Sequence, residues 1–268
     1  MLSRPSSTPR PCAGAFSGMK PAVQQGTLSP VGASPRKGPG KESAVSVEIE
    51  FLGHAGFLLT SSAGCVAIDP WLEGNPVATK KRAEVSCDWI VLTHGHADHM
   101  SDAQALAKAN NATVLAAFEI CEYLGAEGVK TDPGNTGGRI STPFGWVAFT
   151  QAFHSSSFQG RYMGMPCGVI VRFEAENFTF HHLGDTALFS DLKLIGELYK
   201  PDVAAIPVGD RFTMGPEQGK VAAELIKPRI AIPIHWGTFP ILAQDISAFK
   251  PQGVEVKEMR PGEKWQVR

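Results

Sequence analysis

Four potential metal ligands lie close together in the run from Thr93 to His99. The run has the sequence Thr-His-Gly-His-Ala-Asp-His and directly follows the apolar stretch Trp-Ile-Val-Leu at 89–92. Neutral imidazole is the commonest metal ligand in proteins, and together with a carboxylate it forms a site that suits zinc, iron or manganese. A single histidine is usually a surface or core residue. Three histidines and an aspartate at this spacing predict a metal site.

Further ligands are expected elsewhere, because a centre for two metal ions needs about seven protein donors. Three candidates, His154, Asp185 and His235, each follow a run with the apolar pattern of a strand. Sheet scaffolds present their chemically active loops at strand ends, so the repetition at three separate ends is informative. The sequence predicts that these three residues complete the site.

Apolar and alternating runs predict a β-rich domain with interspersed helices. Strands are expected at 45–52, 57–60, 65–68, 113–116, 146–152, 168–173, 178–181, 203–207 and 230–234. Helices are expected at 101–109, 187–199 and 216–226, the last with Pro216 in its first turn. Many strands of antiparallel type in both halves, with helices between them, predict a two-sheet sandwich flanked by helices, of α/β (α+β) class.

Size and charge exclude several classes of protein. With 268 residues, of which 43% are hydrophobic, the chain can bury a substantial core. No apolar run approaches the roughly 18 residues that span a bilayer, so no membrane span is expected. Residues 1–43 hold six of the 25 Lys and Arg and one of the 26 Asp and Glu, which leaves the remainder with a net charge of −6. This acidic remainder argues against a nucleic-acid partner.

Several motifs resemble one protein family. They are Gly-His-Ala-Gly-Phe at 53–57, Gly-Asn-Pro at 74–76, His-Ser-Ser-Ser at 154–157, His-Leu-Gly-Asp-Thr at 182–186, Arg-Phe-Thr-Met-Gly-Pro at 211–216 and Ile-His-Trp-Gly-Thr-Phe-Pro at 234–240. With the run at 93–99 they resemble the metallo-β-lactamase superfamily, and within it a family of metal-dependent hydrolases related to ascorbate-6-phosphate lactonase. The resemblance covers about residues 46–260. It implies a four-layer αββα sandwich for a hydrolase domain at 45–268.

The resemblance also implies a set of seven ligands for two divalent metal ions, with zinc expected and iron or manganese as alternatives. One ion would be held by His94, His96 and His154, the other by Asp98, His99 and His235, with Asp185 bridging. Asp98 would also orient the attacking hydroxide and so act in catalysis. Two such ions lower the pKa of a shared water toward neutrality, which generates hydroxide at pH 7. The β-lactamases of the superfamily generally have Cys at the position of Asp185, so this chain resembles the esterase, lactonase and phosphodiesterase branches.

Four further residues are candidates for contacting the substrate or supporting the ligands. Asp69 resembles the first motif Asp of the superfamily, which orients a ligand or its loop, although it also fits a turn before Pro70. His182, a candidate catalytic residue, and His54 would each hydrogen-bond the substrate or protonate a leaving group. Each of these two also fits a buried, satisfied histidine. Arg211 would bind a substrate carboxylate or phosphate, or form a structural salt bridge.

The sequence therefore predicts a dinuclear metal-dependent hydrolase for a small ester, lactone or phosphodiester. The alternative is a non-catalytic metal-binding scaffold or sensor that retains the fold. A scaffold has no chemical reason to keep every ligand position filled, which weighs against that alternative. Association into a homo-oligomer is compatible with both hypotheses.

The first 44 residues have the composition of a disordered tail. They are rich in Ser, Pro and Gly, contain no Asp and show no apolar periodicity. A Ser-rich, basic and acid-poor N-terminus is also typical of an organelle transit peptide. Pro5, Pro9 and Pro11 prevent an amphipathic helix, which favours a plastid over a mitochondrion. Without import, a cytoplasmic protein is expected.

Residues 1–44 are predicted to be dispensable for folding and to direct plastid import. Their removal should leave the melting temperature unchanged, because their composition offers little surface to bury. A fluorescent protein fused behind them should enter plastids when observed by microscopy. A diffuse cytosolic signal would contradict import, and a loss of folded protein on truncation would show that the tail is structural.

Overall fold

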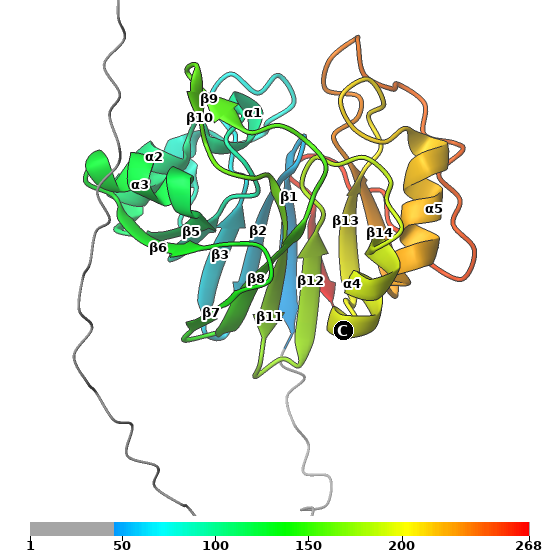
Figure 1. Cartoon of the computed structure of the whole chain (residues 1–268), viewed down its shortest axis with the longest axis horizontal. Helices are drawn as coiled ribbons and strands as arrows, with labels where there is room; N and C mark the ends of the chain where they lie inside the picture. The colour runs from blue at the N-terminus through cyan, green and yellow to red at the C-terminus, as the bar shows by residue number, and fades with distance from the viewer. Residues whose placement is uncertain (1–45, 268) are drawn as a thin grey trace, which may run out of the picture. The chain divides into compact units, whose positions relative to one another are not determined.

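The computed structural model describes residues 46–267, in which two β-sheets pack face to face (Figure 1). The first sheet has the strand order β16 (Lys264–Val267), β1 (Val47–Gly53), β2 (Gly56–Ser61), β3 (Gly64–Ile68), β4 (Trp89–Val91), β5 (Thr113–Ala117) and β6 (Lys130–Gly134). The second has the order β15 (Glu255–Val256), β14 (Ile230–Ile234), β13 (Val203–Pro207), β12 (Phe178–His182), β11 (Cys167–Phe173), β8 (Gly145–Gln151) and β7 (Arg139–Thr142). The predicted tail and transit peptide at 1–44 lie outside the described residues.

Helices cover the outer face of each sheet. The helices α2 (Ala103–Asn110) and α3 (Phe118–Ala126) pack on the first sheet, and α4 (Leu192–Tyr199) and α5 (Pro216–Ile226) pack on the second (Figure 1). Shorter elements are the turns α1 (Ala97–Met100) and η1 (Arg82–Glu84) and the hairpin of β9 (Ser157–Phe158) and β10 (Arg161–Tyr162). None of the described helices is long and apolar enough to cross a membrane. The predicted four-layer αββα class is confirmed.

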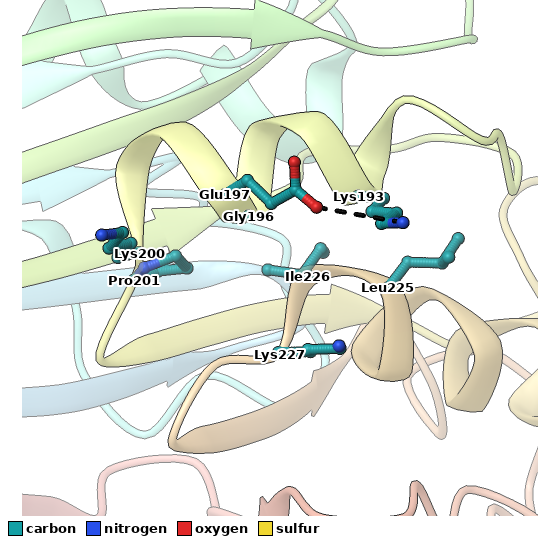
Figure 2. A pocket seen from close by; sticks show the side chains of 8 residues that line it. All are labelled: Lys193, Gly196, Glu197, Lys200, Pro201, Leu225, Ile226 and Lys227. Atoms are coloured by element: carbon teal, nitrogen blue, oxygen red, sulfur yellow. Dashed lines mark ion pairs between the residues drawn. The ribbon is translucent and has the colours of Figure 1, made fainter.

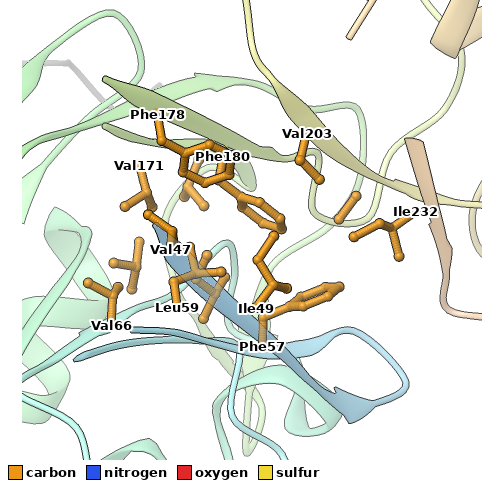
Figure 3. Packing of buried hydrophobic residues seen from close by; sticks show 14 of the residues in the cluster. Val47, Ile49, Phe57, Leu59, Val66, Val171, Phe178, Phe180, Val203 and Ile232 are labelled. Atoms are coloured by element: carbon orange, nitrogen blue, oxygen red, sulfur yellow. The ribbon is translucent and has the colours of Figure 1, made fainter. Parts of the chain in front are cut away.

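The main apolar core lies between the two sheets. Side chains from β1 and β2, such as Ile49 and Phe57, meet side chains from β12 and β13, such as Phe180 and Val203 (Figure 3). The rings of Phe57 and Phe180 lie 5.3 Å apart between centroids. Alternation at period two along these strands directs one set of side chains into this core. Two further apolar clusters each join one sheet to the helices that cover it.

The strands that precede the predicted ligands run in the same direction within each sheet. In the first sheet β1 and β3 are both antiparallel to β2, and β4 is parallel to β3. In the second sheet β8 and β12 are both antiparallel to β11, and β12, β13 and β14 are parallel. The loops after these strands therefore gather at one edge of each sheet, which is where open sheets containing parallel strands bind ligands.

The structure differs from the sequence prediction at three places. The helix expected at 187–199 begins only at Leu192, because the N–H of Ala187 donates to Phe153 O and ties the preceding residues to the loop after β8. Both sheets are mixed and not mainly antiparallel, since α2, α3, α4 and α5 act as crossovers between parallel strands. The elements α3, β6 and β7 were not predicted. β6 contains Pro133, which an edge strand tolerates.

Phe180→Ala is expected to lower the free energy of unfolding by about 3–5 kcal/mol, because the ring is fully buried between the sheets. Phe118→Ala is the matched control, since it removes a ring that is 50% exposed on α3, and it should cost about 1 kcal/mol or less. Urea unfolding followed by circular dichroism measures both values. Equal losses in the two variants would contradict the placement of the main core between the sheets.

Candidate metal centre

The loops at the ends of β4, β8, β12 and β14 bring the seven predicted metal ligands together. His94 Nε2 lies 3.0 Å from His96 Nδ1, and His154 Nε2 lies 3.2 Å from the same atom. These three nitrogens form the first donor group. The second donor group combines residues whose ligand atoms all lie within 4.8 Å of one another, and its members are His54, Asp98, His99 and His235.

The carboxylate of Asp185 contacts members of both donor groups. Its Oδ2 lies 3.5 Å from His154 Nε2 in the first group and 3.0 Å from His235 Nε2 in the second. Its Oδ1 lies 3.4 Å from His99 Nε2. Asp185 is buried. This position between the groups is the one that a bridging ligand requires.

Asp69 fixes the proton on His99. The carboxylate is fully buried at the end of β3, where Oδ1 accepts the backbone N–H of Thr93 at 2.9 Å. Its Oδ2 accepts the Thr93 hydroxyl at 2.6 Å and His99 Nδ1 at 2.7 Å. An ionised carboxylate only accepts hydrogen bonds, so His99 Nδ1 carries a proton, and Nε2 is the nitrogen that faces the centre, where a cation would take the place of a second proton. Asp69 therefore contacts a predicted ligand, and its supporting role stays a prediction.

Thr93 extends the same constraint to His94. Because the Thr93 hydroxyl donates its only hydrogen to Asp69, it must accept a hydrogen bond from His94 Nδ1, which lies 2.9 Å away. The Nε2 atom of His94 is then unprotonated and faces the other nitrogens of the first donor group. Complete burial holds the pKa of His94 well below its usual range, so the ring is neutral.

Several buried atoms in the centre have no hydrogen-bond partner. Among residues 46–267 these atoms include His99 Nε2, Asp185 Oδ1 and both ring nitrogens of His235. Leaving such atoms unsatisfied costs about 1–3 kcal/mol each, and divalent cations would satisfy those that face the donor groups. The mixture of imidazole and carboxylate donors suits zinc, iron or manganese. The residues present therefore fit the metal ions that the sequence predicts.

The buried carboxylates make the centre attractive to cations. Burial opposes a charge on His235, but the carboxylate of Asp185 outweighs it and raises the pKa of His235 to about 9. Burial likewise opposes a charge on His99, yet Asp185 and Asp69 raise the pKa of His99 well above its usual value. Burial would raise the pKa of Asp185, but His235 and His99 hold it well below its usual range.

The turn between β1 and β2 links the two sheets beside the centre. The carbonyl oxygen of His54 accepts the backbone N–H of His235 at 2.8 Å, and that of Ala55 accepts His182 Nε2 at 2.8 Å. His54, Asp69 and His235 have φ angles of 57°, 43° and 60°. Residues other than glycine rarely adopt this backbone conformation. It is found most often where surrounding contacts hold a functional residue in place.

His182 lies beside the centre and does not belong to either donor group. It is fully buried, and the backbone N–H of Gly184 donates to its Nδ1 at 3.0 Å. The ring proton is therefore on Nε2, where it is donated to Ala55 O. Both ring nitrogens of His182 are hydrogen-bonded to backbone groups, which contradicts the predicted proton transfer to a leaving group. The structure favours the alternative of a buried, satisfied histidine that joins the two sheets.

Arg211 is exposed in the loop after β13 and forms no ion pair with any described residue. The structural salt bridge considered for it is therefore absent from residues 46–267, and the binding of a substrate anion stays a prediction. The loop lies against the centre, because a Cβ atom at Gly209 would clash with the carbonyl oxygen of His235. Asp210 and Arg211 both have positive φ angles.

Three supporting residues were not identified from the sequence. Thr93 and Thr238 each hydrogen-bond Nδ1 of a histidine, and both lie inside motifs that were recognised for other residues. Asp102 is buried, accepts the backbone N–H of Leu72 at 2.7 Å and pairs with Arg82 at 2.8 Å, which fixes the loop after Asp69. In the sequence, a hydroxyl residue directly before a predicted ligand histidine is the signal that could have identified Thr93.

Two surface hollows differ in their relation to the centre. One lies between α4 and α5, is lined by Lys193, Glu197 and Lys227 among others, and contains none of the predicted site residues (Figure 2). The other reaches His54 and Thr238 and has an apolar wall that includes Phe51 and Met259. Of these two hollows, the second is the one whose lining includes a donor-group residue, His54.

The chain is similar to known proteins over most of its described length. Residues 48–235 match the family described as the Beta-lactamase superfamily domain. A UPF0173 metal-dependent hydrolase from Geobacillus sp. (strain WCH70) is 46% identical over 225 residues, which cover 81% of this chain and 98% of the relative. A second one, from Geobacillus thermodenitrificans (strain NG80-2), is also 46% identical with the same coverage.

Solved structures agree with this relationship. Igni18, a metallo hydrolase from Ignicoccus hospitalis KIN4/I, has a TM-score of 0.76 and 32% identity, with 83% of this chain and 99% of that chain covered. YhfI from Bacillus subtilis, with a TM-score of 0.64 and 12% identity, supports the metallo-beta-lactamase fold alone. The predicted resemblance is confirmed, whereas the relation to ascorbate-6-phosphate lactonase stays a prediction. The chain belongs to the beta-lactamase superfamily and, within it, to the UPF0173 metal-dependent hydrolases.

Proposed function

We propose that this chain is a dinuclear metal-dependent hydrolase that acts on a small ester, lactone or phosphodiester. The observation that carries the proposal is the position of Asp185, whose two carboxylate oxygens contact both donor groups. A single cation needs only one of these groups. Two groups that share one carboxylate have the arrangement of a two-metal site.

The ligands would divide according to the donor groups. The first ion would be held by His94, His96 and His154, and the second by Asp98, His99 and His235, with Asp185 shared between them. Zinc suits the first group because three imidazoles and one carboxylate complete a four-ligand site. Iron and manganese accept the same donors. When bound, the ions would lower the pKa of a water molecule toward neutrality and polarise a carbonyl or phosphoryl oxygen of the substrate.

Asp98 is placed to act on the reacting atoms. Its side chain is 31% exposed, whereas that of Asp185 is 3% exposed, so Asp98 lies on the open side of the centre. Its Oδ2 lies 3.1 Å from His54 Nε2, which leaves Oδ1 to accept a hydrogen bond from the nucleophilic water. Asp98 would in this way orient the water toward the substrate.

The surroundings of the centre support a small substrate with an apolar part and an anionic part. The hollow next to His54 has an apolar wall formed in part by Phe51, Val77 and Met259. The guanidinium of Arg211 is exposed in the loop that packs against His235 and is available to a carboxylate or phosphate. A lactone or ester with a carboxylate or phosphate group would use both features.

The second candidate is a non-catalytic metal-binding scaffold or sensor. The partial exposure of the Asp98 side chain favours an enzyme, because a purely structural metal site is usually closed off from solvent by its protein ligands. The experiment that separates the two is a hydrolysis assay on the metal-loaded chain with bis-p-nitrophenyl phosphate and panels of lactones and esters. Turnover that is lost on chelation and restored by metal supports the enzyme, and metal binding without turnover on any panel supports the scaffold.

His96→Ala and Asp98→Ala should each lower turnover by several orders of magnitude, because the residues of a two-metal site act as a unit. Asp191→Ala is the control for Asp98, since it removes an exposed carboxylate from the start of α4 and should leave turnover unchanged. Rates are measured on the substrate identified from the panels. Wild-type turnover in His96→Ala, or after exhaustive chelation, would contradict the mechanism.

Asp69→Asn should weaken the binding of both metal ions by about 10–100-fold, because Asp69 sets the proton position on His99 directly and on His94 through Thr93. Thr93→Val should weaken the binding of the ion in the first donor group more than the binding of the other ion. Mass spectrometry of metal content after dialysis against a graded chelator measures both effects. Two metal equivalents at wild-type affinity in Asp69→Asn would refute the supporting role.

A further inference from the structure

The second donor group contains a histidine beyond the seven predicted ligands. His54 is buried at the turn between β1 and β2, and its Nε2 lies 3.1 Å from Asp98 Oδ2. Its ring centroid lies 4.1 Å from that of His235. We propose that His54 is an eighth ligand, which binds the second metal ion directly through Nε2. This inference rests on the dinuclear function proposed above.

Thr238 offers an acceptor for a proton on Nδ1 of His54. His54 Nδ1 lies 2.9 Å from Thr238 Oγ1, and the Thr238 hydroxyl donates to the carbonyl oxygen of Trp236 at 3.4 Å. When the single hydrogen of this hydroxyl goes to Trp236, Thr238 accepts a hydrogen bond from Nδ1–H of His54. Nε2 is then the unprotonated nitrogen, as a metal-bound ring requires.

The unprotonated Nε2 faces another acceptor. Asp98 Oδ2 is a carboxylate oxygen and supplies no proton, so this 3.1 Å pair is held together either by a proton on Nε2 or by a cation between the two atoms. Two lone pairs at this distance repel each other unless a cation lies between them. Ligands that are each about 2.0–2.2 Å from a metal ion lie roughly 3 Å apart, so the distance fits two neighbouring positions around one ion.

The first donor group contains the same arrangement. There the Thr93 hydroxyl donates to Asp69 and accepts from His94 Nδ1 at 2.9 Å, which turns the lone pair of His94 Nε2 toward the other donors. Thr238 and His54 repeat this relation in the second group. Histidines that bind a metal usually donate the other ring N–H to a fixed acceptor, and the two threonine hydroxyls supply such acceptors here.

The ring of His54 is held in this position from several sides. Its backbone carbonyl oxygen accepts the N–H of His235 at 2.8 Å, and its φ angle is 57°. The ring of Trp71 lies 5.3 Å away and that of Phe239 lies 5.9 Å away, both measured between centroids and both edge-on. Nε2 is therefore directed at the donor group in advance, as a ligand requires.

An additional ligand would make the two metal positions unequal. The second ion would have five protein donors, which are His54, Asp98, His99, His235 and Asp185, whereas the first would have four. A five-donor set favours an ion that accepts six ligands, such as manganese or iron, over tetrahedral zinc. The second position would therefore prefer manganese or iron more strongly than the first.

Nuclear magnetic resonance of the full chain with ¹⁵N-labelled histidine and bound ¹¹³Cd tests the bond directly. A scalar coupling between cadmium and Nε2 of His54, together with a protonated Nδ1, is expected. A protonated Nε2 without coupling to cadmium would overturn the proposal, because His54 would then only donate a hydrogen bond to Asp98. This measurement uses the unmutated protein and does not depend on whether a variant folds.

Variants supply a second readout through metal content. The glutamine in His54→Gln can donate a hydrogen bond to Asp98, as His54 would if it were only a donor, but it offers no imidazole nitrogen to a metal. The affinity for the second ion should therefore fall by at least about tenfold. His181→Gln is the matched control, because it replaces a buried histidine that contacts Thr150 and lies outside both donor groups. Both metals should be retained in that control.

The possible results separate this inference from the function on which it rests. If the wild-type chain binds one ion only, the dinuclear function and the eighth ligand are both wrong. If it binds two ions and His54→Gln also binds two with unchanged affinity, only the eighth ligand is wrong. Loss of the second ion in His54→Gln with retention of the first supports the proposal.

Discussion

The carboxylate of Asp69 is the constraint on which the candidate metal centre depends. It accepts three hydrogen bonds, from the backbone and hydroxyl of Thr93 and from Nδ1 of His99. Burying a carboxylate is costly unless such bonds compensate for the lost water, and here they do so within a fully buried site. The same bonds hold a proton on Nδ1 of His99 and of His94, so that Nε2 of each ring faces the centre. One side chain thereby prepares a ligand nitrogen in each donor group.

The fold holds these groups in place by joining the ends of two sheets. The loop after β3 carries Asp69 and the loop after β4 begins with the ligand run, while β12 and β14 supply Asp185 and His235 from the other sheet. The turn at 53–56 bonds to the second sheet through His54 O and Ala55 O. Ligands on rigid strand ends keep a geometry that a metal site needs, so the core between the sheets also serves the chemistry.

Much of the candidate centre could be predicted from the sequence because its candidate ligands are marked by local pattern. The spacing at 93–99 points to four candidate donors, and strand-like runs before His154, Asp185 and His235 point to the others, all of which the structure brings together. The role of His182 could not be predicted in this way, because it depends on hydrogen bonds to Gly184 and Ala55 O, and Ala55 is far away in the sequence. Strand alternation shows which face a side chain occupies but not whether its nitrogens are already used.

The same limit applies to the fold. Apolar runs located most strands and α5, whereas parallel or antiparallel pairing depends on how the crossovers pack, which no local pattern specifies. The start of α4 was placed too early because the bond between Ala187 N–H and Phe153 O joins segments far apart in the sequence. Contacts between distant segments thus account for what the sequence left open, both in the fold and in the centre.

A crystal structure of the zinc-loaded chain, with anomalous data collected at the zinc absorption edge, tests the two-metal centre most directly. Two anomalous peaks about 3.5–4 Å apart are expected, one beside the first donor group and one beside the second, with Asp185 between them. Zinc-to-nitrogen distances of about 2.0–2.1 Å to His94, His96 and His154 are expected at the first peak. A single peak at full metal loading, or peaks away from these residues, would contradict the two-metal centre.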